Sequence, residues 1–430
     1  MHVCRRWRQV VFESPLRLDL RIFCTSRTPV GRYLGIWPAL PIIIDLDYQS
    51  DRRGNNNEDN IITALEHVDR VCSVRLRATD SELKNITTVM QAPYPVLTNL
   101  FMDSKDGNAP VFPAEFLGGS APRLQRIYLD GIPFPTLPTL LLSTSDLVAL
   151  HLHNIPPTGL IPPVAMVVGL AALPRLKTFI IQFRSASPRP DRIHSSPVTR
   201  TVLPALTFFQ FQGASEYLED LVARIDAPQL DRIHITYLNQ LVDFRVPQFP
   251  MFIDRSVGPK LTQHRYAQVA FRSHRVTFRT YRDAGDPDRD EPDAITDVRC
   301  QGFDWQVSHI AQVLSHFIAT LSHILYLKFP VESPLEGTND IELLRLLYQF
   351  PTVQTLFVPY TLAQHFALAL ESTALDTVAE ALPSLVLIFL GGLPADYITK
   401  FVAARLLSGR PVTVVHTHKE FSKRLKSYVK

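Results

Sequence analysis

The chain has 430 residues, 46% of them hydrophobic and 20% charged, which is enough apolar material for an ordinary globular core. Its 44 basic and 41 acidic residues leave a formal net charge of +3, so bulk electrostatics favour neither a nucleic-acid nor a membrane partner. The four cysteines are far apart and form no C-x-x-C pair, which argues against a disulfide framework and predicts a cytoplasmic or nuclear protein. The longest apolar stretches, 164–173 and 385–394, are too short to cross a bilayer.

The predicted elements begin with a helix over residues 1 to about 13, followed by strand patterns at 16–22 and 41–48. A polar loop, rich in Asn and Asp, is expected at 51–60. From residue 60 onward helical and strand patterns alternate. The clearest helical patterns are 61–68, 81–91, 215–225, 305–317, 340–350, 361–371 and 395–407. An irregular segment is expected at 243–260, where three prolines interrupt the pattern, and a basic amphipathic helix at 419–430.

A repeated apolar pattern, L-x-x-L-x-L, organises most of the chain. Proline stands two residues before many of its openings, as in Pro95 before Leu97 and Pro122 before Leu124. The spacing between openings ranges from 23 residues (124 to 147) to 36 residues (230 to 266). The twelve openings are Val71, Leu97, Leu124, Leu147, Leu176, Leu206, Leu230, Tyr266, Ile295, Ile324, Val353 and Leu385. A period of this size with one short strand per unit predicts a solenoid.

The proline gives the pattern a physical cause, because it disfavours helical geometry at the preceding residue and starts an extended segment. Strand, crossover helix and strand together predict parallel pairing. The predicted fold is therefore α/β: an irregular leucine-rich-repeat-like solenoid over 18–430, with a parallel sheet and outer helices. The sheet face away from the core is the expected binding surface. Its best candidates for contacting a protein substrate are Arg75, Arg77, Phe101, Arg126, Tyr128, His151, His153, Arg232 and His234.

The first residues, from Val3 through Cys4 and Trp7 to Val11, resemble the closing helix of an F-box, which carries a V-C-x-x-W signature. With the continuation through 14–20 and 36–41, the chain is similar to F-box proteins with degenerate leucine-rich repeats found in mushroom-forming fungi. The resemblance makes residues 1–17 the C-terminal remnant of an F-box whose Leu-Pro segment is not in this sequence. It implies a substrate receptor of a cullin-type ubiquitin ligase. Val3, Cys4 and Trp7 would then contact an Skp1-type adaptor, and the repeats an unknown protein substrate.

Other functions have weaker sequence support. No nucleophile-elbow, P-loop, H-E-x-x-H or dinucleotide-binding motif occurs, so no enzyme activity and no cofactor is predicted. His151, His153 and His234 could ligate a metal, but a polar contact surface is the favoured interpretation, and no metal site is predicted. The acidic stretch from Asp286 to Asp297 partly matches a calcium loop and is expected to be a solvated loop.

Two alternatives stay open at the level of the sequence. Basic and aromatic residues alternate between Lys260 and Arg282, which suits either an anionic ligand or, preferably, neutralisation by nearby acidic residues. No nucleic-acid partner is predicted. The second alternative concerns function: the chain could be a stand-alone repeat scaffold for protein interactions, with no link to a ligase.

Overall fold

The structure is a computed structural model that describes residues 5–6, 9–10, 21–36, 40–47, 58–186, 199–238, 247–256, 260, 263–282, 292–299, 303–315, 321–330, 340–371, 382–391 and 398–417. The chain is α/β with a large, mostly parallel sheet. It divides into two compact units. The first comprises Met1–Ser187 and Pro197–Thr207, and the second comprises Pro188–Ser196 and Phe208–Lys430.

In the first unit seven strands pair in chain order, and every pair is parallel. The strands are β1 (Ile22–Cys24), β2 (Ile42–Asp47), β3 (Val71–Ala78), β4 (Asn99–Ser104), β5 (Arg126–Asp130), β6 (Ala149–Ile155) and β7 (Thr178–Phe183). A further short strand is β8 (Thr201–Val202). Parallel neighbours require a crossover between successive strands, and helical segments provide it here.

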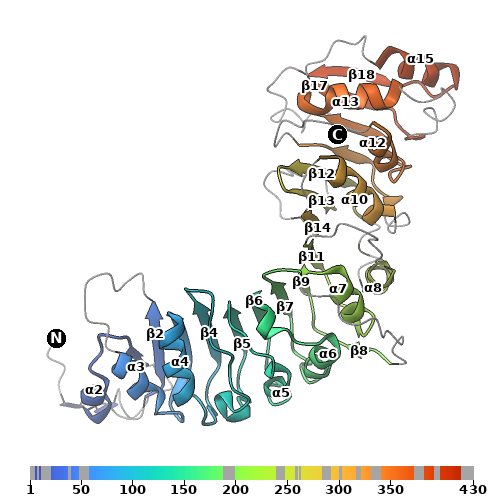
Figure 1. Ribbon diagram of the computed structural model, residues 1–430. Helices are drawn as coiled ribbons and strands as arrows, with labels where there is room; N and C mark the ends of the chain where they lie inside the picture. Colours follow the sequence, from blue (N-terminus) through green and yellow to red (C-terminus); the bar gives the residue numbers. More distant parts are fainter. Residues whose placement is uncertain are drawn as a thin grey trace. The chain divides into compact units, whose positions relative to one another are not determined.

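These helical segments lie on one side of the strands (Figure 1). They are α2 (Val30–Ile36), α3 (Glu58–Leu65), α4 (Asp80–Val89), η2 (Phe116–Gly119), α5 (Leu137–Leu141), η3 (Pro157–Gly159) and α6 (Pro163–Ala171). The start of α4 is fixed by a capping box, in which the Thr79 hydroxyl accepts the Glu82 N–H and the Glu82 carboxylate accepts the Thr79 N–H. The sequence predicted this helix at 81–91.

The apolar repeat positions form the core of this unit. Within β4, Leu100 and Met102 are at most 2% exposed, and their paired neighbours on β5, Ile127 and Leu129, are buried as well. The openings Leu97 and Leu124 are fully buried before the strands begin. Side chains two apart on a strand share one face, so these positions place one face of the sheet against the helices. The prediction that they face the core is confirmed.

In the described part of the second unit, nine strands follow one another in the large sheet in the order β9, β11, β14, β13, β12, β15, β16, β17, β18. Their bounds are β9 (Phe208–Gly213), β11 (Arg232–Tyr237), β12 (Tyr266–Arg272), β13 (Arg275–Tyr281), β14 (Ala294–Arg299), β15 (Tyr326–Lys328), β16 (Thr355–Val358), β17 (Leu387–Gly391) and β18 (Thr413–Thr417), with the two-residue β10 (Ile225–Asp226). The helices are α7 (Ser215–Val222), α8 (Gln248–Ser256), α10 (Phe303–Ser315), α12 (Asp340–Leu347), α13 (Tyr360–Glu371) and α15 (Thr399–Leu407).

Two of the predicted repeat openings, Tyr266 and Ile295, are wrong. β13 pairs antiparallel with both β12 and β14, so these strands do not follow the parallel pattern of the sequence repeat. Tyr266 pairs with Tyr326, two residues after the opening Ile324, so His264 takes the position of the opening. Ile295 pairs with His234 and shares that residue's outward face instead of facing the core. The chain reverses at a two-residue turn after Arg272, so β12 and β13 form an antiparallel hairpin that the apolar repeat does not predict.

Candidate functional site

The first unit carries the candidate site on the sheet face opposite its helices. We call it the β3–β6 face and define it by Arg75, Arg77, Phe101, Arg126, Tyr128, His151 and His153. Side chains on parallel strands line up in rows across the strands, because paired positions lie side by side about 4.8 Å apart. Three rows matter here. The first contains Ser73, Asn99, Arg126 and Ala149, the middle row Arg75, Phe101, Tyr128 and His151, and the end row Arg77, Asp103, Asp130 and His153.

An aromatic pair occupies the centre of the middle row. The rings of Phe101 and Tyr128 stack with their centroids 4.3 Å apart and an interplanar angle of 8°. The Arg75 guanidinium lies 5.7 Å from the centroid of the Phe101 ring, within the range of a cation–π contact. Tyr128 also contacts His153 at 4.8 Å between ring centroids. The register of three strands therefore fixes a continuous row of large, partly exposed side chains.

The end row is a network whose polar groups pair with one another. The Arg77 Nε donates to the Asp103 Oδ2 at 2.7 Å. Asp130 accepts from the Asn154 amide at 2.7 Å and from the Tyr128 hydroxyl at 3.2 Å. Burial, followed by the nearby Asp130 carboxylate, raises the pKa of Tyr128 to about 12, so its hydroxyl remains a donor at neutral pH.

A local irregularity in β6 brings Asn154 into this network. The pairing register between β6 and β7 shifts between Leu152 and Ile155, and Asn154 has a φ of +48°. Asparagine tolerates this left-handed conformation better than most residues. On the same strand the His153 Nδ1 lies 2.7 Å from the Gln182 Oε1 of β7. The bulge thus aims Asn154 at Asp130 while leaving His153 on the face.

The first and middle rows also contain cationic side chains without acidic partners. Arg75 and Arg126 are exposed, and neither forms an ion pair with a residue in the described part of the chain. His151 is half-buried, and burial lowers its pKa, with further lowering by His153 and Arg126. His151 is therefore neutral at physiological pH. The positive charge of the first and middle rows at that pH comes from Arg75 and Arg126.

Arg232 and His234 belong to the second unit and have separate surroundings. The Arg232 guanidinium lies 5.5 Å from the centroid of the Phe208 ring. The His234 Nε2 lies 3.1 Å from the Asp297 Oδ2 and 3.5 Å from the Thr236 hydroxyl. A catalytic triad needs the carboxylate and the hydroxyl on opposite ring nitrogens, whereas both contacts here use the same one. This arrangement orients an imidazole without activating a nucleophile.

Two groups of predicted residues lie outside the described part of the chain. They are the predicted adaptor contacts Val3, Cys4 and Trp7, and Asp286, Asp288 and Asp290 of the acidic stretch. In the basic and aromatic stretch the aromatic rings of Tyr266, Phe271, Phe278 and Tyr281 are at most 7% exposed, so they offer no stacking surface. Arg282 bonds to Asp231 at 2.6 Å, and Lys260 lies 3.5 Å from the same carboxylate, so acidic neighbours compensate these cations.

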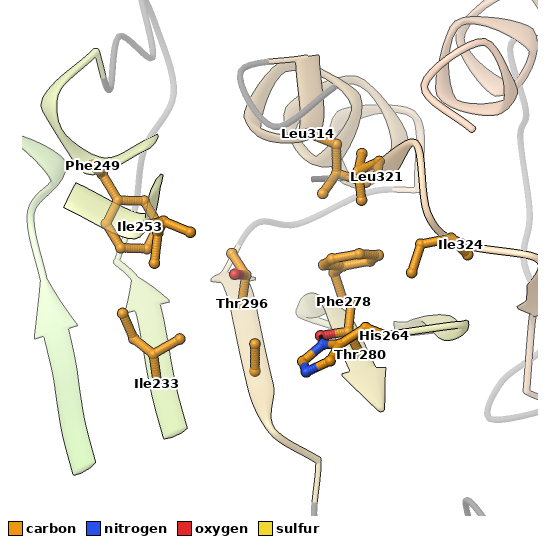
Figure 2. Close-up of a pocket in the computed structure, with 11 residues that line it drawn as sticks. Ile233, Phe249, Ile253, His264, Phe278, Thr280, Thr296, Leu314, Leu321 and Ile324 are labelled. Carbon is orange, nitrogen blue, oxygen red and sulfur yellow. Dashed lines mark hydrogen bonds between the residues drawn. The ribbon is translucent and has the colours of Figure 1, made fainter. Parts of the chain in front are cut away.

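A hollow in the second unit is a different kind of candidate. It has a volume of about 520 Å³, part of it open to solvent. Its lining is largely apolar: Ile233, Phe249, Ile253, His264, Phe278, Thr280, Ala294, Thr296, Leu314, Leu321 and Ile324. Figure 2 shows Leu314 and Leu321 on the helix side of Phe278, with the His264 ring beside Thr280. The hollow lies where small residues, Ala294 and Thr296, occupy core-facing strand positions.

Among the described residues that line the hollow, His264 is the only ionisable one. Its Nδ1 lies 2.8 Å from the Thr280 hydroxyl, and its Nε2 lies 3.5 Å from the Asp293 carboxylate. Burial lowers the pKa of His264, so the ring is neutral at physiological pH. The described residues of the lining supply one neutral imidazole and two threonine hydroxyls in an otherwise apolar surface.

The described ranges contain no group of three or more His, Cys, Asp and Glu side chains arranged to hold a metal ion. Among the helices of those ranges, none combines the length and the apolar character that crossing a bilayer requires.

Sequence reasoning found most of the β3–β6 face and missed two residues that shape it. Asn154 was not predicted because its role depends on the bulge in β6. Asp45 lies opposite Arg75 in the backbone register of β2 and β3, without forming an ion pair with it, and extends the middle row by one strand. The alternation of polar and apolar residues in β2 was the signal that would have placed it. No protein-family model matches the chain, and no curated protein matches it.

Proposed function

We propose that this chain is a non-catalytic protein-recognition subunit that binds a polypeptide on the β3–β6 face. The observation that supports it most is the stacked pair Phe101 and Tyr128 with Arg75 beside it, on three adjacent strands. Tyr and Arg are the residue types that most often carry binding energy in protein interfaces. Side chains fixed by a sheet register lose little conformational entropy when a partner binds.

We also propose that the α/β fold is an irregular leucine-rich-repeat-like solenoid. In its favour, the first unit pairs its strands in chain order, with a helical crossover after most of them. The apolar openings of the sequence repeat are buried at successive strands, including Leu97, Leu124 and Leu147. Repeat proteins of this type commonly bind partners over an extended sheet surface.

The proposed setting is an Skp1–cullin–F-box ubiquitin ligase in the cytoplasm or nucleus. Support comes from the V-C-x-x-W sequence at Val3, Cys4 and Trp7, which resembles the closing helix of an F-box. In this role the chain holds a substrate near the ligase and raises the effective concentration of the substrate's lysines without contributing a reactive group.

The test is retention of purified Skp1 by this chain and by a version extended at its N-terminus with a complete F-box helix set. We expect the extended version to retain Skp1 and Trp7→Ala to weaken that retention. Val10→Ala is the matched control, because Val10 is an exposed residue of the same segment. Failure of both versions to retain Skp1 would show that the ligase assignment is wrong.

A stand-alone protein-interaction scaffold is the second candidate. The residues that define the β3–β6 face come from strands between positions 71 and 155, and none of them belongs to the first 17 residues of the sequence. Binding of a polypeptide partner by a chain that never retains Skp1 would favour this candidate over the ligase subunit.

A further inference from the structure

The charges of the β3–β6 face are paired at one end of the strands and not at the other. In the end row, Asp103 is bonded to Arg77, and Asp130 accepts from Asn154 and Tyr128. Each carboxylate thus already accepts a bond of about 2.7 Å, and Arg77 compensates the charge of Asp103. The end row is therefore less attractive to a basic partner than two uncompensated carboxylates would be.

The first and middle rows have the opposite character. Arg126 is exposed at the first position of β5, in the first row, and Arg75 is exposed two strands away on β3, in the middle row. Neither has a carboxylate within 4.0 Å in the described part of the molecule, and Arg75 has only its contact with the Phe101 ring. An arginine presents five N–H donors, and these two leave most of theirs to solvent. These two rows can therefore accept negatively charged groups without breaking any bond.

The aromatic pair Phe101 and Tyr128 also favours a partner with acidic or carbonyl oxygens. Phe101 and Tyr128 stack face to face, so each ring turns one face toward the other. The Arg75 guanidinium lies against the Phe101 ring and the His153 ring against Tyr128, which leaves little free ring face for stacking on a nucleobase. The edge of an aromatic ring carries the positive end of its quadrupole and attracts oxygen acceptors. The row therefore suits carboxylates and peptide carbonyls better than bases.

We propose that the first and middle rows of the β3–β6 face bind acidic residues, Asp or Glu, in an extended segment of a protein partner. The proposal rests on the protein-recognition function proposed above and specifies the chemistry of the substrate. Arg75 and Arg126 are two strand spacings apart across the sheet and two residues apart along the strands, about 12 Å in all. Side chains of an extended chain alternate between its two sides, so the two carboxylates must be an even number of residues apart, and residues four positions apart span about 13 Å. The partner motif is thus two acidic residues separated by three others.

The experiment is a selection of random displayed dodecapeptides on the full chain, followed by fluorescence anisotropy with labelled synthetic copies of the selected peptides. Each peptide is also made with Asn or Gln in place of its acidic residues. The variants are Arg75→Gln, Arg126→Gln and the two combined. Arg123→Gln is the matched control, because Arg123 is also exposed and unpaired but lies in the turn before β5, off the face.

We expect selected peptides to be enriched in Asp and Glu at a spacing of four. Binding to the double variant should be about tenfold weaker, at about 0.7 kcal/mol for each exposed ion pair, and Arg123→Gln should bind like the wild type. Raising the salt concentration should weaken wild-type binding and leave that of the double variant nearly unchanged.

Three results would overturn the inference: no peptide is selected, the selected peptides lack acidic enrichment, or they bind the double variant as tightly as the wild type. Selection of peptides that lack acidic residues would reject the inference while leaving protein recognition on this face in place. Failure to retain Skp1 would reject the ligase assignment alone.

Discussion

Glu219 makes the stability of the second unit depend on pH, in the direction opposite to that of an ordinary surface carboxylate. It lies on α7, and its carboxylate accepts the N–H groups of Gln248 and Phe249, at 2.6 and 3.0 Å, at the start of α8. Burial raises the pKa of Glu219 from 4.5 to about 7, although the two N–H donors act against the rise. The native state therefore keeps the Glu219 proton to a higher pH than the unfolded chain does.

The magnitude follows from the size of that shift. A group whose pKa is higher in the folded state contributes stability that is fully present below its unfolded pKa, here about 4.5, and lost as the pH rises to about 7. Between these values the free energy of unfolding should fall by about 3 kcal/mol, at about 1.4 kcal/mol per pH unit. In Glu219→Gln the side chain stays neutral, so this decline should disappear. Its amide nitrogen cannot accept an N–H, so the variant also loses one cap bond, about 1 to 3 kcal/mol, at every pH.

The assay is urea unfolding between pH 4.5 and 8, followed by the fluorescence of Trp305 in a chain whose other two tryptophans, Trp7 and Trp37, are replaced by phenylalanine. Trp305 belongs to the second unit, so it reports on the unit that contains Glu219. Glu115→Gln is the control, because Glu115 is an exposed carboxylate of the first unit. The reasoning is refuted if wild type and Glu219→Gln show parallel pH profiles.

Three further predictions concern stability and are checked by urea unfolding at pH 7. Tyr94→Phe should cost about 1 to 3 kcal/mol, because the fully buried Tyr94 hydroxyl donates to the Leu65 carbonyl at 2.9 Å; no loss would mean that the bond contributes nothing. Gly118→Ala should cost more than Gly119→Ala. Both glycines have a positive φ, but a Cβ at position 118 would lie 2.6 Å from the Pro93 nitrogen, while position 119 is open; equal costs would contradict this. Ala294→Val should stabilise the second unit by about 1 kcal/mol by filling part of the hollow, and a loss of stability would show that the space is not available.

The parts of the structure that depend on short-range alternation could be predicted from the sequence. The outward positions of Phe101 and Tyr128 follow from the buried residues on either side of them, and both are outward in the structure. Two helices also match closely: 361–371 was expected and α13 spans Tyr360–Glu371, while 340–350 was expected and α12 spans Asp340–Leu347. Periodicity identifies these elements because one face of each is buried.

The parts that depend on distant partners could not be predicted. The irregular segment expected at 243–260 contains α8, in which Pro250 is the third residue, in the first turn, where a missing N–H costs nothing. The carboxylate that satisfies the start of α8 comes from Glu219, about 30 residues earlier. The reversal between β12 and β13 uses Ser273 and His274, and neither is a glycine or asparagine that would signal a tight turn. The contacts within the end row depend likewise on which strands become neighbours.

The central claim is that a polypeptide binds on the β3–β6 face and not on the helix side of the first unit. Photo-cross-linking tests it most directly, with benzoylphenylalanine placed in the full chain at Tyr128 or at Val164, an exposed residue of α6. The ligand is a labelled dodecapeptide from the selection described above. We predict a peptide adduct from position 128 and none from position 164. An adduct from position 164 with none from position 128 would contradict the account.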